Sequence, residues 1–410
     1  MSKKRIVISI LALVLALAIA VPGVAPVQAL SCTLKVNLNT MNDGNATISG
    51  TGLDVSVAKV TVNKTDGTLV TKKDGVTGTC SFTLPADTYN VVSVQGPIAS
   101  ASRTDGIVVS SDTFLNVPCG KLRVNLNTNN DGTALISGTG LDVPVDRVSV
   151  NKSDGTLDVT KKDNVLGTYS FALLATAGTA FTYDVVSAKW SGPVSRTNTG
   201  VTVASGDNVL NVPCGKLFVT AYANNNTNWA ASLARVTVNK TGGSVVVYKD
   251  AVYAVNGTYS IALLATDGTF TYDVVSVQGP ISSASRTETG VTVASGDNVL
   301  DVPVARFRVA VVKGDFLPSG GYVVVTVNKT GGILVTKKDG VVSTEFSLLQ
   351  SDNGGANLTS TTGTTPINGT GVGAYTFFAT KSGTVPVAQT TASANEIPPA
   401  GLAGVILMLP

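Results

Sequence analysis

The chain has 410 residues, of which 43% are hydrophobic and 13% are charged, with a net charge of +3 at pH 7. This hydrophobic content excludes an intrinsically disordered chain, and the lack of any accumulated basic patch argues against nucleic acid as a partner. Because the sequence contains no histidine, it cannot form a Ser-His-Asp triad or use an imidazole base. We therefore expect a protein that is not an enzyme and needs no cofactor.

The first 29 residues have the pattern of a signal peptide. A basic start at Lys3, Lys4 and Arg5 precedes an apolar run from Ile6 to Val21, and Val27-Gln28-Ala29 fits a cleavage site. The apolar run is short for a membrane span, so an uncleaved anchor is the less favoured alternative. We expect a secreted or cell-surface protein with no transmembrane segment in the mature chain.

A fourfold internal repeat organises the remainder. Asn63-Lys64-Thr65-Asp66-Gly67 recurs at Asn151, Asn239 and Asn328, at offsets of 88, 88 and 89 residues. A period near 90 is long enough for each copy to bury its own core. The sequence thus predicts four β-sandwich modules, which are residues 30–118, 119–213, 214–303 and an atypical terminal module 304–410.

The second copy shows the expected strands most clearly. Leu122, Val124 and Leu126 alternate with polar residues, as in a half-buried strand. Further strands are expected at Val148 and Val150, at Tyr169, Phe171 and Leu173, at Tyr183, Val185 and Ser187, at Val201 and Val203, and at Leu210 and Val212. Turn signals such as Asp154-Gly155 separate these runs. About seven short strands and no helical period predict an all-β fold of Ig-like or transthyretin-like sandwiches.

The junctions between copies repeat as well. Asn116-Val117-Pro118-Cys119-Gly120 matches the segments that begin at Asn211 and at Asp301. So short a connection, with proline in it, favours a stiff and extended array. The fourth copy carries a polar insertion, 351–373, and ends in the apolar segment 404–409. That segment is too short to cross a membrane and aligns with the closing strands of the other copies, so we expect it to be the last strand.

Several segments carry a family resemblance. Gly167-Thr168-Tyr169-Ser170-Phe171 followed by Tyr183-Asp184-Val185-Val186 in the second copy, and the matching residues of the first and third, resemble the carboxypeptidase-regulatory-like, or transthyretin-like, β-sandwich. Collagen-adhesin stalk modules and bacterial Ig-like modules are close rivals. All three resemblances imply a stalk, scaffold or adhesion role.

The four cysteines suit an oxidising compartment. Cys32 and Cys80 both have the phase of core residues of the first copy, so Cys32–Cys80 is the favoured disulfide of three possible connectivities. Cys119 and Cys214 stand at identical joints one module apart, too far from each other to pair. We expect them to be free thiols or to link two molecules, and small buried joint residues are the alternative.

Other residues suggest weaker sites. Asn63, Asn151, Asn239 and Asn328 are candidate glycosylation sites in expected turns. The loop Asn127–Gly132 resembles a calcium loop but lacks a charged first ligand, so we expect a plain turn and no metal. Trp190 and Trp229, each present in one copy only, are taken as incidental rather than as a sugar platform.

These patterns favour a non-catalytic surface structural protein, acting as a stalk, scaffold or filament component. The alternative is an array of modules that binds a carbohydrate or another extracellular polymer, such as a surface glycan. Such an array needs a repeated surface cluster, and the sequence offers only a recurring Ser-Arg-Thr at Arg103, Arg196 and Arg286. We expect each of these arginines to lie beside an acidic or carbonyl group. The apolar C-terminal strand predicts self-association by strand addition.

Overall fold

We describe a computed structural model of the chain. It describes residues 31–41, 52–96, 101–129, 140–155, 159–189, 194–221, 232–250, 258–279, 284–302, 304–313, 323–329, 333–339, 343–349, 374–381, 388–393 and 402–409. The expected signal peptide, Trp190, Trp229 and the polar insertion lie outside these residues. The chain divides into two compact units, of which the first comprises the chain up to Lys121 together with 172–179 and 204–206.

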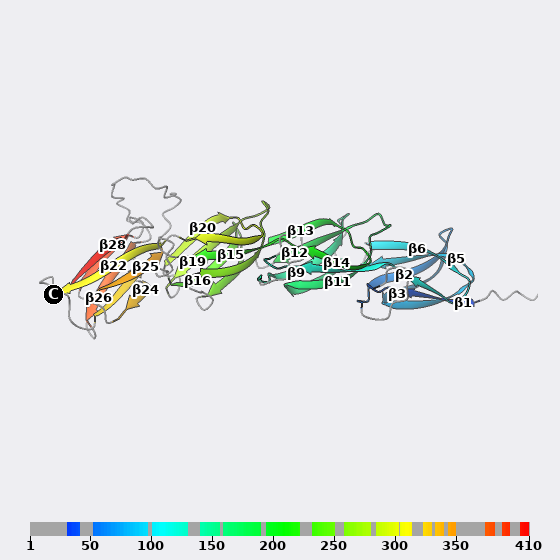
Figure 1. Ribbon diagram of the computed structural model, residues 1–410, viewed down its shortest axis with the longest axis horizontal. Coiled ribbons are helices and arrows are strands. Elements are labelled where there is room, and N and C mark those ends of the chain that lie inside the picture. Colours follow the sequence, from blue (N-terminus) through cyan, green and yellow to red (C-terminus); the bar gives the residue numbers. More distant parts are fainter. Residues whose placement is uncertain are drawn as a thin grey trace, which may run out of the picture. The chain divides into compact units, whose positions relative to one another are not determined.

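Each copy of the repeat contributes one three-stranded and one four-stranded sheet (Figure 1). In the first copy the three-stranded sheet has the order β4-β1-β7, in which β1 is antiparallel to β4 and parallel to β7. The four-stranded sheet has the order β3-β2-β5-β6. The strands are β1 (Ser31–Asn37), β2 (Ser56–Lys64), β3 (Leu69–Thr77), β4 (Thr79–Pro85), β5 (Asp87–Gln95), β6 (Ala101–Val109) and β7 (Thr113–Asn116).

The second and third copies repeat this arrangement, with sheets β11-β8-β14 and β10-β9-β12-β13, then β18-β15-β21 and β17-β16-β19-β20. The strands of the second copy are β8 (Cys119–Asn125), β9 (Pro144–Lys152), β10 (Thr160–Leu166), β11 (Thr168–Leu174), β12 (Tyr183–Lys189), β13 (Val194–Val201) and β14 (Gly206–Asn211). Those of the third are β15 (Cys214–Thr220), β16 (Leu233–Lys240), β17 (Val245–Asp250), β18 (Thr258–Leu264), β19 (Tyr272–Gln278), β20 (Ala284–Val291) and β21 (Gly296–Asp301).

The fourth copy has sheets β25-β22-β28 and β24-β23-β26-β27. Its strands are β22 (Val304–Lys313), β23 (Val323–Lys329), β24 (Ile333–Lys338), β25 (Ser343–Leu349), β26 (Ala374–Lys381), β27 (Ala388–Ser393) and β28 (Leu402–Leu409). β28 runs parallel to β22, as the closing strands β7 and β21 do beside β1 and β15. The prediction of a last strand is thus confirmed, as is the all-β fold of tandem sandwiches.

The core of each sandwich lies between its two sheets, because alternate residues of each strand face inward. In the first copy Leu34 and Val36 of β1 are buried against Val60 and Val62 of β2 in one cluster. A buried tyrosine begins the core-facing set of β5 and β19. Tyr89 donates its hydroxyl to the carbonyl of Pro85 at 2.8 Å, and Tyr272 donates to that of Leu264 at 2.9 Å. Each tyrosine thereby fixes the end of the neighbouring strand.

No helix among the described residues is long and apolar enough to cross a membrane.

Candidate functional site at the joints between copies

The connections between copies are very short. Only Val117 and Pro118 lie between β7 and β8, and only Val212 and Pro213 lie between β14 and β15. The carbonyl of each proline accepts a hydrogen bond from the next copy, at 3.0 Å from the Ala175 amide and at 3.1 Å from the Ala265 amide. The polypeptide link itself is therefore held against the copy that follows it.

Apolar residues of the following copy complete the core of the first. Cys119, the first residue of β8, and Leu174, the last residue of β11, belong to the same buried cluster as Leu34 and Val36. Cys119 and Cys214 have no exposed surface, and Leu174 and Leu264 are also buried. The joint is thus a small hydrophobic interface.

Gln95 at the end of β5 binds the edge of this interface. Its Nε2 donates to the carbonyl of Ala172 at 2.9 Å, and its Oε1 accepts from the amide of Leu174 at 3.0 Å. The side-chain amide of Gln95 thus pairs with the backbone of β11 in the way that the backbone of a neighbouring strand would. At the third joint Gln278, at the end of β19, accepts from the amide of Leu349 at 2.9 Å in the same way.

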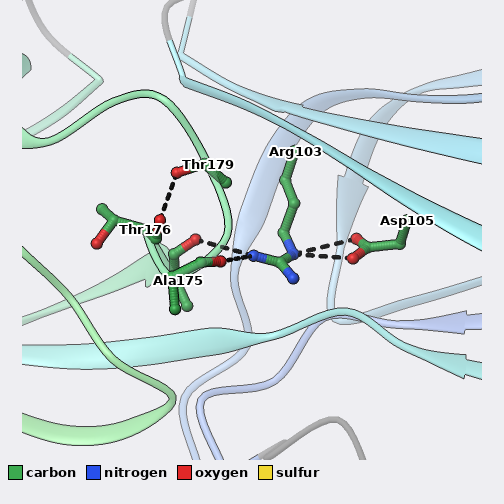
Figure 2. A network of polar contacts seen from close by, with 6 residues as sticks. Arg103, Asp105, Ala175, Thr176 and Thr179 are labelled. Carbon is green, nitrogen blue, oxygen red and sulfur yellow. Dashed lines mark hydrogen bonds and ion pairs between the residues drawn. The ribbon is translucent and has the colours of Figure 1, made fainter.

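Arg103 of β6 makes further polar contacts at the first joint (Figure 2). Its Nε lies 3.0 and 3.2 Å from the two carboxylate oxygens of Asp105, and its Nη1 donates to the carbonyl of Ala177 at 2.6 Å. A longer contact of 3.4 Å joins Nη1 to the carbonyl of Ala175. The arginine therefore bridges a carboxylate of its own copy and a loop of the next, which confirms the expected acidic and carbonyl neighbours.

The loop that receives Arg103 is shaped by its own sequence. Thr179 donates its backbone amide and its hydroxyl to the carbonyl of Thr176, at 3.0 and 2.6 Å (Figure 2). Gly178 has a φ of 75°, a conformation that glycine adopts without strain. The turn directs the carbonyl groups of Ala175 and Ala177 toward the guanidinium. In the third copy Thr269 closes the equivalent turn onto Thr266.

At the second joint the carboxylate that pairs with the arginine comes from the following copy. Arg196 of β13 forms an ion pair with Asp267, which occupies the loop position of Ala177, and its Nη1 lies 3.4 Å from the carbonyl of Ala265. The position of Asp105 is held by Asn198, whose Oδ1 is buried without a hydrogen-bond partner, as is the Nε of Arg196. Each of these two joints thus contains one arginine and one carboxylate partner.

The second joint also replaces the glutamine. Lys189 stands where Gln95 and Gln278 stand, at the end of β12. It lines a small cavity with Ala262, Leu264 and Tyr272. Burial lowers the pKa of this lysine, and the repulsion of Lys249 adds to the effect while Asp146 opposes it. A charged ammonium cannot accept the amide hydrogen that glutamine accepts.

At the third joint Arg286 of β20 pairs with Glu288 at 2.5 Å. The side chains of Arg103, Arg196 and Arg286 are only 13%, 17% and 18% exposed, against 50% for Arg235 on a sheet face. Each stands opposite a buried serine in the sheet, namely Ser93, Ser187 and Ser276. Burial of this degree separates the joint arginines from ordinary surface charges.

The joint cysteines are buried small residues, and both are free thiols within this chain, which was one of the two expected outcomes; a link between molecules stays a prediction. Desolvation raises the pKa of Cys119 and of Cys214 to about 12. A thiol that is fully buried and protonated is neither reachable nor nucleophilic. Their burial also fits the alternative, a small buried residue at each joint.

The favoured disulfide also needs correction. Both residues face the first core, since Cys32 is buried and Cys80 is half-buried against it. The register, however, places Cys32 opposite Leu84 and Cys80 opposite Val36. Four residues of strand separate the two cysteines by roughly 13 Å, beyond the limit of about 7 Å for a disulfide. The phase argument found the correct face but not the position along the strand.

The four candidate glycosylation residues do not lie in turns. Asn63, Asn151, Asn239 and Asn328 are each the second-last residue of a strand that pairs on both sides, namely β2, β9, β16 and β23. Asn151 is buried and the other three are half-buried. In the first three copies the turn begins after the following lysine. The expected accessibility is therefore wrong, and glycosylation itself stays a prediction.

Asn127, the first residue of the calcium-like loop, donates its Nδ2 to Asp142 at 2.9 Å and accepts from the amide of Asn129 at 3.0 Å. Those are contacts typical of a turn, and residues 130–132 of the loop lie outside the described residues. In the described part of the chain, no group of three or more Cys, Asp or Glu side chains is placed to hold a metal ion.

Sequence reasoning missed Gln95, Gln278 and the loop of Ala175–Thr179 as joint residues. One signal was present. Both glutamines follow a buried tyrosine by six residues, and the loop is lengthened only in copies that follow another copy.

No protein-family model matches this chain, and no curated protein matches it. Among solved structures, similarity is found to the Bacillus anthracis TIE protein, at 13% identity over 93% of this chain and 69% of that one, with a TM-score of 0.19. The full-length major pilin SpaD from Corynebacterium diphtheriae is 12% identical over 67% of this chain and 97% of its own, with a TM-score of 0.19. The full-length RrgB pilus protein from Streptococcus pneumoniae is 10% identical over 93% and 98%, with a TM-score of 0.18. At such TM-scores these similarities have no bearing on function.

The fold defines a protein of tandem β-sandwich modules, in which short connections and buried contacts join the end of one copy to residues of the next.

Proposed function

We propose that the chain is a secreted, non-catalytic structural protein of the cell surface, whose copies form a stalk or scaffold. The observation that carries this proposal is the recurrence of one joint. Arg103 and Arg196 each reach a loop of the following copy, and Gln95 and Gln278 each bind the following strand. A chain that serves as a spacer gains from such joints, because they oppose bending between modules.

The recurring arginine also weighs against the polymer-binding alternative. It is the one repeated polar feature that the sequence offered for binding. In the structure Arg103 and Arg196 contact the following copy, and Arg286 pairs with Glu288 of its own strand. Two of the three arginines that could make a binding array specific thus contact the following copy instead. The carboxypeptidase-regulatory-like resemblance and the signal peptide remain part of the proposal, since a stalk of this kind acts outside the cell.

Self-association through the C-terminal strand belongs to the same proposal. β28 is the outer strand of its sheet, where backbone groups are open to strand addition. Sedimentation of the full-length protein over a wide concentration range measures this association. A strictly monomeric protein at high concentration excludes the filament version and leaves the stalk.

Immunogold electron microscopy of intact cells that express the protein tests the proposed role. We expect label on the outer surface, displaced from the envelope, and lost after mild surface proteolysis. Label confined to the cell interior, or soluble protein with no surface fraction, would overturn the proposal.

A further inference from the structure

The first copy differs from the others at the end that would receive a predecessor. In the third and fourth copies this end carries a pair of buried apolar residues in register, Cys214 opposite Leu264 and Val304 opposite Leu349. Cys119 and Leu174 have the corresponding places in the second copy. In the first copy the register pair is Ser31 opposite Pro85, and both residues are exposed.

Pro85 removes the backbone amide that binds glutamine at the first and third joints. At the first and third joints a glutamine of the preceding copy accepts a hydrogen bond from the amide of Leu174 or Leu349. Proline has no amide hydrogen. A glutamine presented to the first copy would therefore lose its acceptor contact and be buried with an unsatisfied oxygen, which is unfavourable.

The receiving loop is absent as well. Only Ala86 separates β4 from β5 in the first copy, whereas residues 175–182 separate β11 from β12 and residues 265–271 separate β18 from β19. The carbonyl groups that bind Arg103 and Arg196 belong to those longer loops. Two separate features of the joint are thus missing from the first copy.

The far end of the fourth copy has lost the complementary residues. The register position of Arg103 in β6 corresponds to Ala388 in β27, and that of Asp105 corresponds to Thr390. Lys381 stands where Gln95 stands. The fourth copy thus lacks the arginine that the three earlier copies have at this position, and it has no carboxylate at the position of Asp105.

We infer that two register positions, the first residue of the first strand and the last residue of the strand beside it, decide whether a copy can receive another, and that Ser31 and Pro85 close the first copy. The joint is then directional, and its residues do not serve to link one molecule to the next head to tail. This inference rests on the proposed structural role but concerns the joints themselves.

The full-length variant Leu174→Pro gives the second copy the proline that the first copy has at this position. We expect the variant to fold, since Pro85 is accommodated at the same register in the first copy, and circular dichroism checks this. The readout is the labelling rate of Cys119 by a small thiol reagent, with Cys214 of the next joint as an internal control. We expect about a tenfold faster reaction at Cys119 and no change at Cys214.

Gln95→Leu removes the acceptor instead of the donor and should act in the same direction if Leu174→Pro folds poorly. A folded Leu174→Pro variant with Cys119 labelling within twofold of the wild type overturns the inference. In a second arm, the thiol introduced by Ser31→Cys is labelled in dilute and in concentrated protein. We expect equal rates. Protection on concentration would show that this end does receive another molecule. Neither result depends on where microscopy places the protein.

Discussion

Arg196 pairs with Asp267, a carboxylate of the following copy, whereas the equivalent Arg103 pairs with Asp105 of its own strand. At the second joint, where Asp267 supplies the carboxylate, Asn198 stands at the position equivalent to Asp105. At the first joint, where Asp105 supplies it, Ala177 stands at the position equivalent to Asp267. In both joints the arginine thus has one carboxylate partner. The two joints are not interchangeable, because exchanging their loops would leave Arg196 without a carboxylate and give Arg103 two.

The first prediction concerns Arg103. Arg103→Ala removes a half-buried ion pair and the hydrogen bond to the Ala177 carbonyl, and it leaves Asp105 buried without its partner. Losses of this kind amount to about 1–3 kcal/mol, so the joint should open about tenfold more often. The rate of Cys119 labelling at pH 8 measures the opening, because the buried thiol, with a pKa of about 12, reacts only when exposed. Arg147→Ala removes an exposed ion pair and serves as the control. Equal effects of the two variants would contradict a role for Arg103 in the joint.

The sequence predicted the core-facing strands because those strands alternate. Val148 and Val150 of β9, and Phe171 and Leu173 of β11, are buried as their period requires. Edge strands gave no such signal. Lys72 and Lys73 lie within β3, an outer strand that has only one buried residue. An outer strand that covers little of the core has no periodic pattern, and lysine there protects the sheet edge from pairing.

The joint could be predicted only in part. The repeated segment at Cys119 and the recurring arginines indicated a short connection and a polar partner. The partners themselves lie about 70 to 80 residues away in sequence, such as Ala177 for Arg103 and Leu174 for Gln95. Contacts of this kind depend on how two sheets end beside each other, and no local period records that. For the same reason the sequence correctly predicted that Cys32 and Cys80 face the core, but it could not show that they lie four residues apart along the paired strands.

A second prediction tests the exchange of carboxylates. Asp267→Ala should leave the guanidinium of Arg196 without an acid and raise Cys214 labelling by about tenfold, with Cys119 unchanged. Adding Asn198→Asp recreates the arrangement of Arg103 and Asp105 within one strand. The double variant should return the rate to within about threefold of the wild type. Two additive effects, without recovery, would mean that the carboxylate acts by some other means than neutralising Arg196.

A third prediction follows from the register of the first copy. Since Cys32 and Cys80 are too far apart to bridge, a reducing agent should leave the thermal unfolding midpoint of the secreted protein unchanged. Non-reducing peptide mass spectrometry should recover the two cysteines in separate peptides. A fall of several degrees on reduction, together with a linked peptide, would show that the first sandwich adopts another register.

The last prediction concerns Lys189, which stands where two other joints have glutamine. Lys189→Gln places an acceptor near the amide of Leu264 and removes an amine whose pKa is lowered by burial. We expect the second joint to be stabilised by about 0.5–1.5 kcal/mol, seen as slower Cys214 labelling at neutral pH and a higher unfolding midpoint.

The pH dependence of this advantage follows from the linkage between protonation and folding. A folded-state pKa below that of the unfolded chain destabilises the wild type fully at low pH, and this penalty disappears as the pH rises through the folded pKa toward the usual lysine value. The advantage of the variant should therefore be largest near neutrality and shrink in alkaline solution. Lys72→Gln, which changes an exposed lysine of β3 in the first copy, is the control. An advantage that grows with pH would show that the buried amine is not what weakens this joint.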